Sequence, residues 1–108
     1  MIISKDIYTD NKIKRPYRQL RLIIKGKVRR NIYMVCFIND TGRLEIYPTL
    51  QFRQKKMREL NLLVVGLFAS MKDATEFICR LTDISLESKC DFDYRQAFNI
   101  FTKRLKQI

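Results

Sequence analysis

One segment of this chain is apolar on both faces of a predicted strand. Residues 31–39 include seven successive apolar residues, from Ile32 to Ile38. Side chains of a strand alternate between its two faces, so a strand that is apolar on both is covered on both, at least in part. This segment therefore predicts a central strand of a sheet that lies between two layers.

A second strand is predicted earlier in the chain. Within residues 17–25, Leu20, Leu22 and Ile24 alternate with residues that are mostly polar or charged. A period of two is typical of a half-buried strand. The dipeptide Gly26-Lys27 is then predicted to turn the chain toward the central strand.

Two more strands follow. Residues 43–47 alternate between apolar and charged side chains, and a turn at residues 39–42 predicts that they form a hairpin with the central strand. Residues 61–69 are mostly apolar and predict a further buried strand. Residues 1–16 are mixed and polar, and they are interpreted as an irregular basic arm that could contain a short strand near its start.

The last third of the chain predicts two helices. Ser70 stands where an N-cap would, and Asp73 follows three residues later, as in a capping box. The apolar residues of the first helix recur at helical spacing: Ala74, Phe77, Ile78, Leu81 and Ile84. Asp91 or Asp93 is predicted to cap the second helix, whose apolar face comprises Ala97, Phe98, Phe101 and Leu105.

These elements predict the fold class. The order is three strands, a basic connector at residues 49–60 that forms a short helix or a loop, a fourth strand and two helices. We expect an α+β fold, with a largely antiparallel four-stranded sheet and two C-terminal helices packed on it. A chain of 108 residues predicts a single domain, residues 1–108, and 46% hydrophobic residues suffice for a core without metals or disulfides.

The positive charge of the chain is concentrated in its first part. Residues 1–60 contain fifteen basic and five acidic residues, which is ten of the eleven net positive charges. The cations lie in the arm, where Lys12 and Lys14 also stand, in the turn after residue 24 and in the connector. The predicted nucleic-acid-binding residues are Arg15, Arg18, Lys25, Lys27, Arg29, Arg30, Arg53, Lys55, Lys56 and Arg58.

Aromatic residues lie among these cations, namely Tyr17, Tyr33, Tyr47 and Phe52. Cations neutralise phosphates and flat rings stack on unpaired bases, so the mixture favours RNA or single-stranded DNA as the partner. The charge fits an acidic protein as well, and strands that are apolar on both faces would also fit a homo-oligomer.

The residue types present argue against several kinds of catalytic and metal site. The chain has no histidine, so the common general base near neutral pH is missing, and Ser-His-Asp and Cys-His arrangements are excluded. Asp91 and Asp93 could hold Mg²⁺, but their position at a helix start favours capping. Cys36 and Cys79 are predicted to be buried and Cys90 to be a free thiol in a loop; this set matches no common zinc site. We expect no catalytic residue, metal or cofactor.

The sequence thus favours a small non-enzymatic module that contacts nucleic acid through its N-terminal half. One alternative is a protein-interaction or self-associating module. A third possibility is a small ribonuclease that acts without histidine, for which Arg29 and Arg30 would be the residues to test. No segment is apolar and long enough for a signal peptide or a membrane span, so we expect a cytoplasmic protein with no membrane partner.

Overall fold

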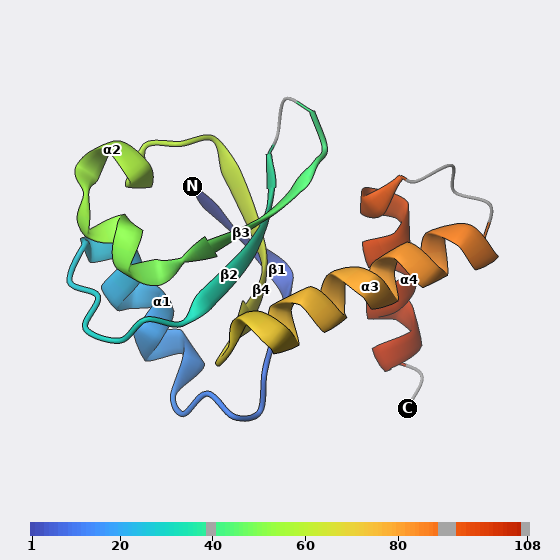
Figure 1. Ribbon diagram of the computed structural model, residues 1–108, viewed down its shortest axis with the longest axis horizontal. Coiled ribbons are helices and arrows are strands. Elements are labelled where there is room, and N and C mark those ends of the chain that lie inside the picture. The colour runs from blue at the N-terminus through green and yellow to red at the C-terminus, as the bar shows by residue number, and fades with distance from the viewer. Residues whose placement is uncertain (39–40, 89–92, 107–108) are drawn as a thin grey trace.

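Four strands form one mixed sheet, and helices cover both of its faces (Figure 1). The computed structural model describes residues 1–38, 41–88 and 93–106. The elements in chain order are β1 (Ile2–Thr9), α1 (Pro16–Lys25), β2 (Tyr33–Ile38), β3 (Leu44–Pro48), the short 3₁₀ helix η1 (Thr49–Arg53), α2 (Lys55–Arg58), β4 (Leu62–Phe68), α3 (Met71–Glu87) and α4 (Tyr94–Lys106).

The strand order in the sheet is β1-β4-β2-β3. Strand β2 pairs antiparallel with both β3 and β4, whereas β1 pairs parallel with β4. The predicted α+β class, a four-stranded sheet and the two C-terminal helices are therefore confirmed, with a sheet that is mixed because β1 is parallel to β4 and with one strand that was not the predicted one. The predicted hairpin is present as β2 and β3, and Gly42, the last residue of the predicted turn, has the positive φ of 68° that glycine adopts easily.

Strand β2 is covered on both faces, as its composition predicts. Met34 and Cys36 belong to a core cluster with residues of α1 and η1, and Val35 and Phe37 belong to a second cluster with residues of α3 and α4. All four side chains are at most 1% exposed. The sheet therefore separates two cores, one under each helical layer.

Residues 17–25 form helix α1, so the prediction of a strand there was wrong. Pro16 stands at the start of the helix, where a missing N–H costs nothing, and Gly26 follows its end with a φ of 72°. The N–H of Lys27 donates to the carbonyl of Leu22, the closure of a Schellman motif. Short apolar runs fit either period, and here the helix buries Ile23, which in a strand would lie on the face opposite Leu22 and Ile24.

The fourth strand of the sheet is formed by the N-terminal residues and not by residues 17–25. Residues 2–9 form β1, so the interpretation of residues 1–16 as an irregular arm was wrong for this part, although residues 11–15 do lie outside regular elements. Ile3 pairs with Val64 and Thr9 with Leu67 of β4. The alternation in β1 is weak, and its partner is far away in the chain, so only the tertiary structure places it in the sheet.

The helix caps follow the sequence prediction. Ser70 Oγ accepts a hydrogen bond from the Asp73 N–H at 3.2 Å, and Asp93 Oδ1 accepts one from the Arg95 N–H at 3.0 Å. Asp91 and Cys90 lie outside the described residues. Among these described residues, no helix is both long and apolar enough to cross a membrane.

The two described cysteines differ. Cys36 is fully buried in β2, and burial raises the pKa of its thiol to about 12, which keeps it protonated and unreactive. Cys79 is exposed, so its predicted burial was wrong. The reason is helical phase: the face of α3 toward the core carries Phe77 and Leu81, and Cys79 lies on the opposite face.

Candidate nucleic-acid interface

The positive charge of the protein lies in one layer of the fold. We name this the basic layer: residues 11–32 and 49–60, which comprise α1, η1, α2 and the loops around them, on the face of the sheet opposite α3 and α4 (Figure 1). The layer contains thirteen basic residues and one acidic residue, Glu59. The remaining chain has nine basic and ten acidic residues, so the layer accounts for all of the net positive charge.

The loop after α1 and the connector are joined by arginine side chains. Arg53 Nε donates to the carbonyl of Val28 at 2.7 Å. Arg58 Nη1 donates to the carbonyls of Phe52 and Arg53 at 2.8 Å each. Its guanidinium packs so closely over Gly26 that a Cβ at residue 26 would lie 2.6 Å from Arg58 Cζ. Arg53 and Arg58 thus hold the layer together with groups that were predicted to bind a ligand.

A buried threonine anchors the same loop to η1. Thr49 is fully buried; its Oγ1 accepts from the Ile32 N–H and donates to the Arg30 carbonyl, both at 3.0 Å. The hydroxyl therefore satisfies a buried donor and an acceptor at once. This anchor sets where the loop with Arg29 and Arg30 leaves the core.

We expect Thr49→Val to lower the free energy of unfolding by about 1–3 kcal/mol, because it keeps the shape but leaves the buried Ile32 N–H without its acceptor. Urea denaturation followed by circular dichroism measures the change. Thr75→Val is the matched control, since Thr75 is exposed on α3 and its loss is expected to stay within about 0.5 kcal/mol. Equal effects of the two changes would contradict the anchoring role.

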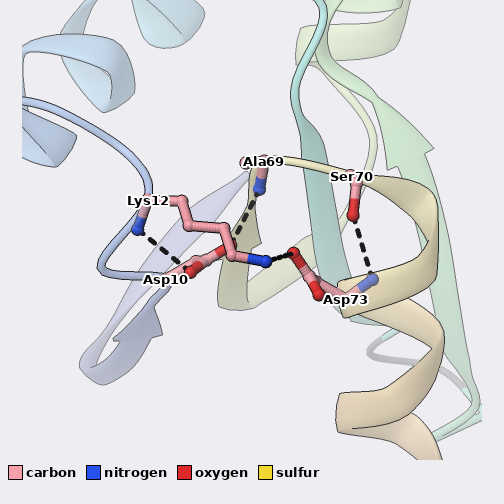
Figure 2. A network of polar contacts seen from close by, with 5 residues as sticks. All are labelled: Asp10, Lys12, Ala69, Ser70 and Asp73. Atoms are coloured by element: carbon pink, nitrogen blue, oxygen red, sulfur yellow. Dashed lines mark hydrogen bonds and ion pairs between the residues drawn. The ribbon is translucent and has the colours of Figure 1, made fainter.

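The segment before α1 is fixed to the start of α3 by a polar network (Figure 2). The carboxylate of Asp10 accepts hydrogen bonds from the N–H of Lys12 at 3.1 Å and of Ala69 at 3.3 Å. Lys12 Nζ lies 3.0 Å from Asp73 Oδ2. This hydrogen bond raises the pKa of Lys12 and lowers the pKa of Asp73. The hydrogen bond with the capping Ser70 hydroxyl also lowers the pKa of Asp73. Lys12 is therefore engaged with a carboxylate of the protein itself.

The segment before α1 and the loop after it meet at a cavity. It has a volume of about 290 Å³ and is lined by Lys12, Gln19, Arg30 and Asn31 on its polar side. The three basic segments of the sequence are thus brought together: the cavity joins the first to the second, and Arg53 joins the second to the third.

The predicted site residues fall into two groups. Arg58 is half-buried and the other nine are exposed. Arg53 and Arg58 bind backbone carbonyls, and Lys55 Nζ lies 3.9 Å from Glu59 Oε1. The other seven predicted residues make no ion pair or side-chain hydrogen bond with another residue in the described part of the chain, and the same holds for Lys14 and Arg21 of the layer. The layer thus has nine exposed cations without such a partner: Lys14, Arg15, Arg18, Arg21, Lys25, Lys27, Arg29, Arg30 and Lys56.

Arg21 was not predicted as a site residue. It lies three residues after Arg18 and four before Lys25, so the three cations share one exposed face of α1. This spacing is visible in the sequence, but it becomes a signal only when residues 17–25 are assigned as a helix.

The aromatic residues of the prediction are mostly unavailable to a ligand. Phe52 is fully buried, Tyr47 packs edge-on against it with ring centroids 5.9 Å apart, and Tyr33 is half-buried in β2. Tyr17, in the first turn of α1, is 73% exposed. Within the basic layer it is the aromatic side chain that solvent reaches.

No group of three or more histidine, cysteine or acidic side chains within residues 1–38, 41–88 and 93–106 is arranged to hold a metal ion. None of the family models, curated proteins or solved structures compared with this chain matches it. The geometry and charge of the basic layer are therefore the features of the molecule that point to a function.

Proposed function

We propose that this protein is a small non-enzymatic module that binds nucleic acid through its basic layer. The observation that carries the proposal is the set of nine exposed, unpaired cations in a layer with a single acid. Cations that have no protein carboxylate as a partner can replace the counterions of a phosphate backbone, and the release of those counterions drives binding.

The arrangement of the cations favours an extended polyanion. Arg18, Arg21 and Lys25 form a row along α1, which is about 15 Å long at 1.5 Å per residue. The exposed loop with Lys27, Arg29 and Arg30 continues from the end of that helix. A backbone with regularly repeated negative charges can contact such a row at several points, each of which adds to the affinity.

The alternatives have less support. Self-association was suggested by apolar strand faces, and both faces of the central strand β2 are buried under helices of the same chain. An acidic protein partner fits the charge but would need clustered carboxylates that match the row on α1. The third alternative is cleavage of RNA by Arg29 and Arg30. Incubation of a labelled RNA strand with the protein, followed by gel analysis, tests it.

Fluorescence anisotropy with a short labelled RNA or DNA strand at increasing NaCl concentration tests the proposal. If four to six of the nine cations contact phosphates of a single strand, the slope of log affinity against log salt is expected to be about −3 to −4. Absence of binding even at about 20 mM salt, far below the range in which such contacts are screened, would overturn the proposal.

Polyglutamate of matched total charge is the control for an acidic partner. We expect it to displace the labelled strand only weakly, because its charges sit on flexible side chains and it has no bases. If polyglutamate competes as well as unlabelled RNA, the layer binds acidic polymers in general and the proposal is wrong.

A further inference from the structure

The outward face of α1 carries an exposed ring among cations. Tyr17 is 73% exposed, the highest value of the large hydrophobic residues in the described part of the chain, and Ile24 on the same face is 52% exposed. Arg18 and Arg21 are exposed beside Tyr17, at the adjacent position and one turn later. A large ring left in solvent at this place makes no contribution to the core.

The rest of α1 shows that Tyr17 is not simply a surplus apolar residue of an amphipathic helix. The apolar side of the helix is already satisfied, since Leu20 and Ile23 are at most 5% exposed and belong to the core cluster with β2 and β4. Phe52, the other aromatic residue of the basic layer, is fully buried in that cluster. The layer therefore presents one ring to a ligand, and this ring lies at the start of the row of cations on α1.

We propose that the outward face of α1 recognises single-stranded nucleic acid, with an unpaired base stacked on Tyr17 and adjacent phosphates on Arg18 and Arg21. This inference rests on the proposed function and names its substrate class. An unpaired base offers a free face to an aromatic ring, whereas the bases of a duplex are stacked on each other and keep their faces covered. A duplex can use only the cations of this surface.

An anionic membrane is the other polyanion that such a face could meet, and the structure favours it less. A helix that lies in a membrane surface inserts a continuous apolar face. Here the outward apolar residues are Tyr17 and Ile24 alone, separated by two turns of cationic helix, and the continuous apolar face of α1 is buried against the sheet.

The first test compares Tyr17→Ala and Tyr17→Phe by anisotropy with oligouridine, oligothymidine and a duplex of the same length. Stacking on one ring predicts that Tyr17→Ala weakens single-strand binding at least about fivefold, while Tyr17→Phe keeps it within about twofold. The salt slope should not change, because no charge is removed. Duplex binding, expected to be weaker at the outset, should be unaffected by either change.

The second test uses the absence of tryptophan from the chain. Tyr17→Trp places the only tryptophan of the variant on α1, where it can be excited apart from the tyrosines, and stacking against a base is expected to quench its emission when oligothymidine is added. Leu86→Trp is the matched control, since Leu86 is 58% exposed in the last turn of α3, and that end of the helix lies away from α1 (Figure 1). Its emission should not respond.

The outcomes separate the two proposals. If neither strand nor duplex binds, the proposed function itself fails. If both bind equally well and Tyr17→Ala has no effect on either, the basic layer binds nucleic acid but the assignment of single strands through Tyr17 is overturned. A blue shift of the residue 17 tryptophan on vesicles with about one third anionic lipid, with no response to oligothymidine, would overturn it in favour of a membrane surface.

Discussion

Replacement of Arg18, Arg21 and Lys25 by glutamine together is expected to weaken binding to a single strand about a hundredfold at about 0.1 M salt. These side chains form one exposed row on α1 and have no partner among the described residues, so each can release one counterion equivalent on binding. At about 0.7 units of salt slope per phosphate contact, three lost contacts make the slope shallower by about two units. Anisotropy titrations at several salt concentrations measure both quantities.

The control for this variant removes the same charge elsewhere. Lys5, Lys72 and Lys103 are exposed and lie outside the basic layer, on β1, α3 and α4. Their joint replacement by glutamine lowers the net charge equally, and we expect it to change affinity less than about threefold. Equal losses in the two triple variants would show that only net charge matters and that no interface exists on α1.

Phe77→Ala is expected to have the largest effect on stability, a loss of about 3–5 kcal/mol in the free energy of unfolding. Phe77 is 3% exposed, and its ring lies 5.0 Å from that of Phe68, 5.3 Å from Phe101 and 5.7 Å from Tyr8, measured between centroids. It thus joins α3 to β4, α4 and β1. A domain of this size has a total stability of only about 5–15 kcal/mol, so much of it would be lost.

Urea denaturation followed by circular dichroism measures this loss, with two comparison variants. Phe77→Leu retains most of the volume and should cost less than about half as much as Phe77→Ala. Leu86→Ala, at an exposed position of the same helix, should change stability by less than about 0.5 kcal/mol. Because Phe77 lies on the face of the sheet opposite the basic layer, Phe77→Leu is expected to bind a single strand like the unchanged protein; a loss of binding would contradict the separation of the two layers.

The elements that the sequence predicts well are those with strong local signals. Residues 31–39 are apolar on both faces, and the structure confirms β2 as a strand covered on both sides. Ser70 and Asp93 precede helices with apolar residues at helical spacing, and both act as caps. In these segments pattern, capping and packing agree, so local sequence suffices.

The elements that were missed have ambiguous or distant signals. The apolar residues of 17–25 fit alternation and helical spacing equally well, and Pro16 and Gly26 at its ends are what favour the helix. Strand β1 depends on pairing with β4, some sixty residues later in the chain. With residues 17–25 predicted as a strand, a four-stranded sheet was complete without residues 2–9. The two wrong predictions therefore have a common origin.

In the candidate site, too, some features follow from the sequence and others only from the tertiary structure. The sequence alone determines the excess of basic residues, their three segments and the absence of histidine, because these are properties of composition and order. It also determines that the central strand must be buried on both faces. None of this distinguishes a cation that faces a ligand from one that holds the protein together.

That distinction was decided only by the tertiary structure. Folding brings Arg53 within 2.7 Å of the Val28 carbonyl and Lys12 within 3.0 Å of Asp73, while Arg18 and Arg21 are left in solvent beside Tyr17. The physical reason is that the partner of a charge is set by distance in space. Only when residues 16–25 form a helix that packs on the sheet do Tyr17, Arg18 and Arg21 share one exposed surface.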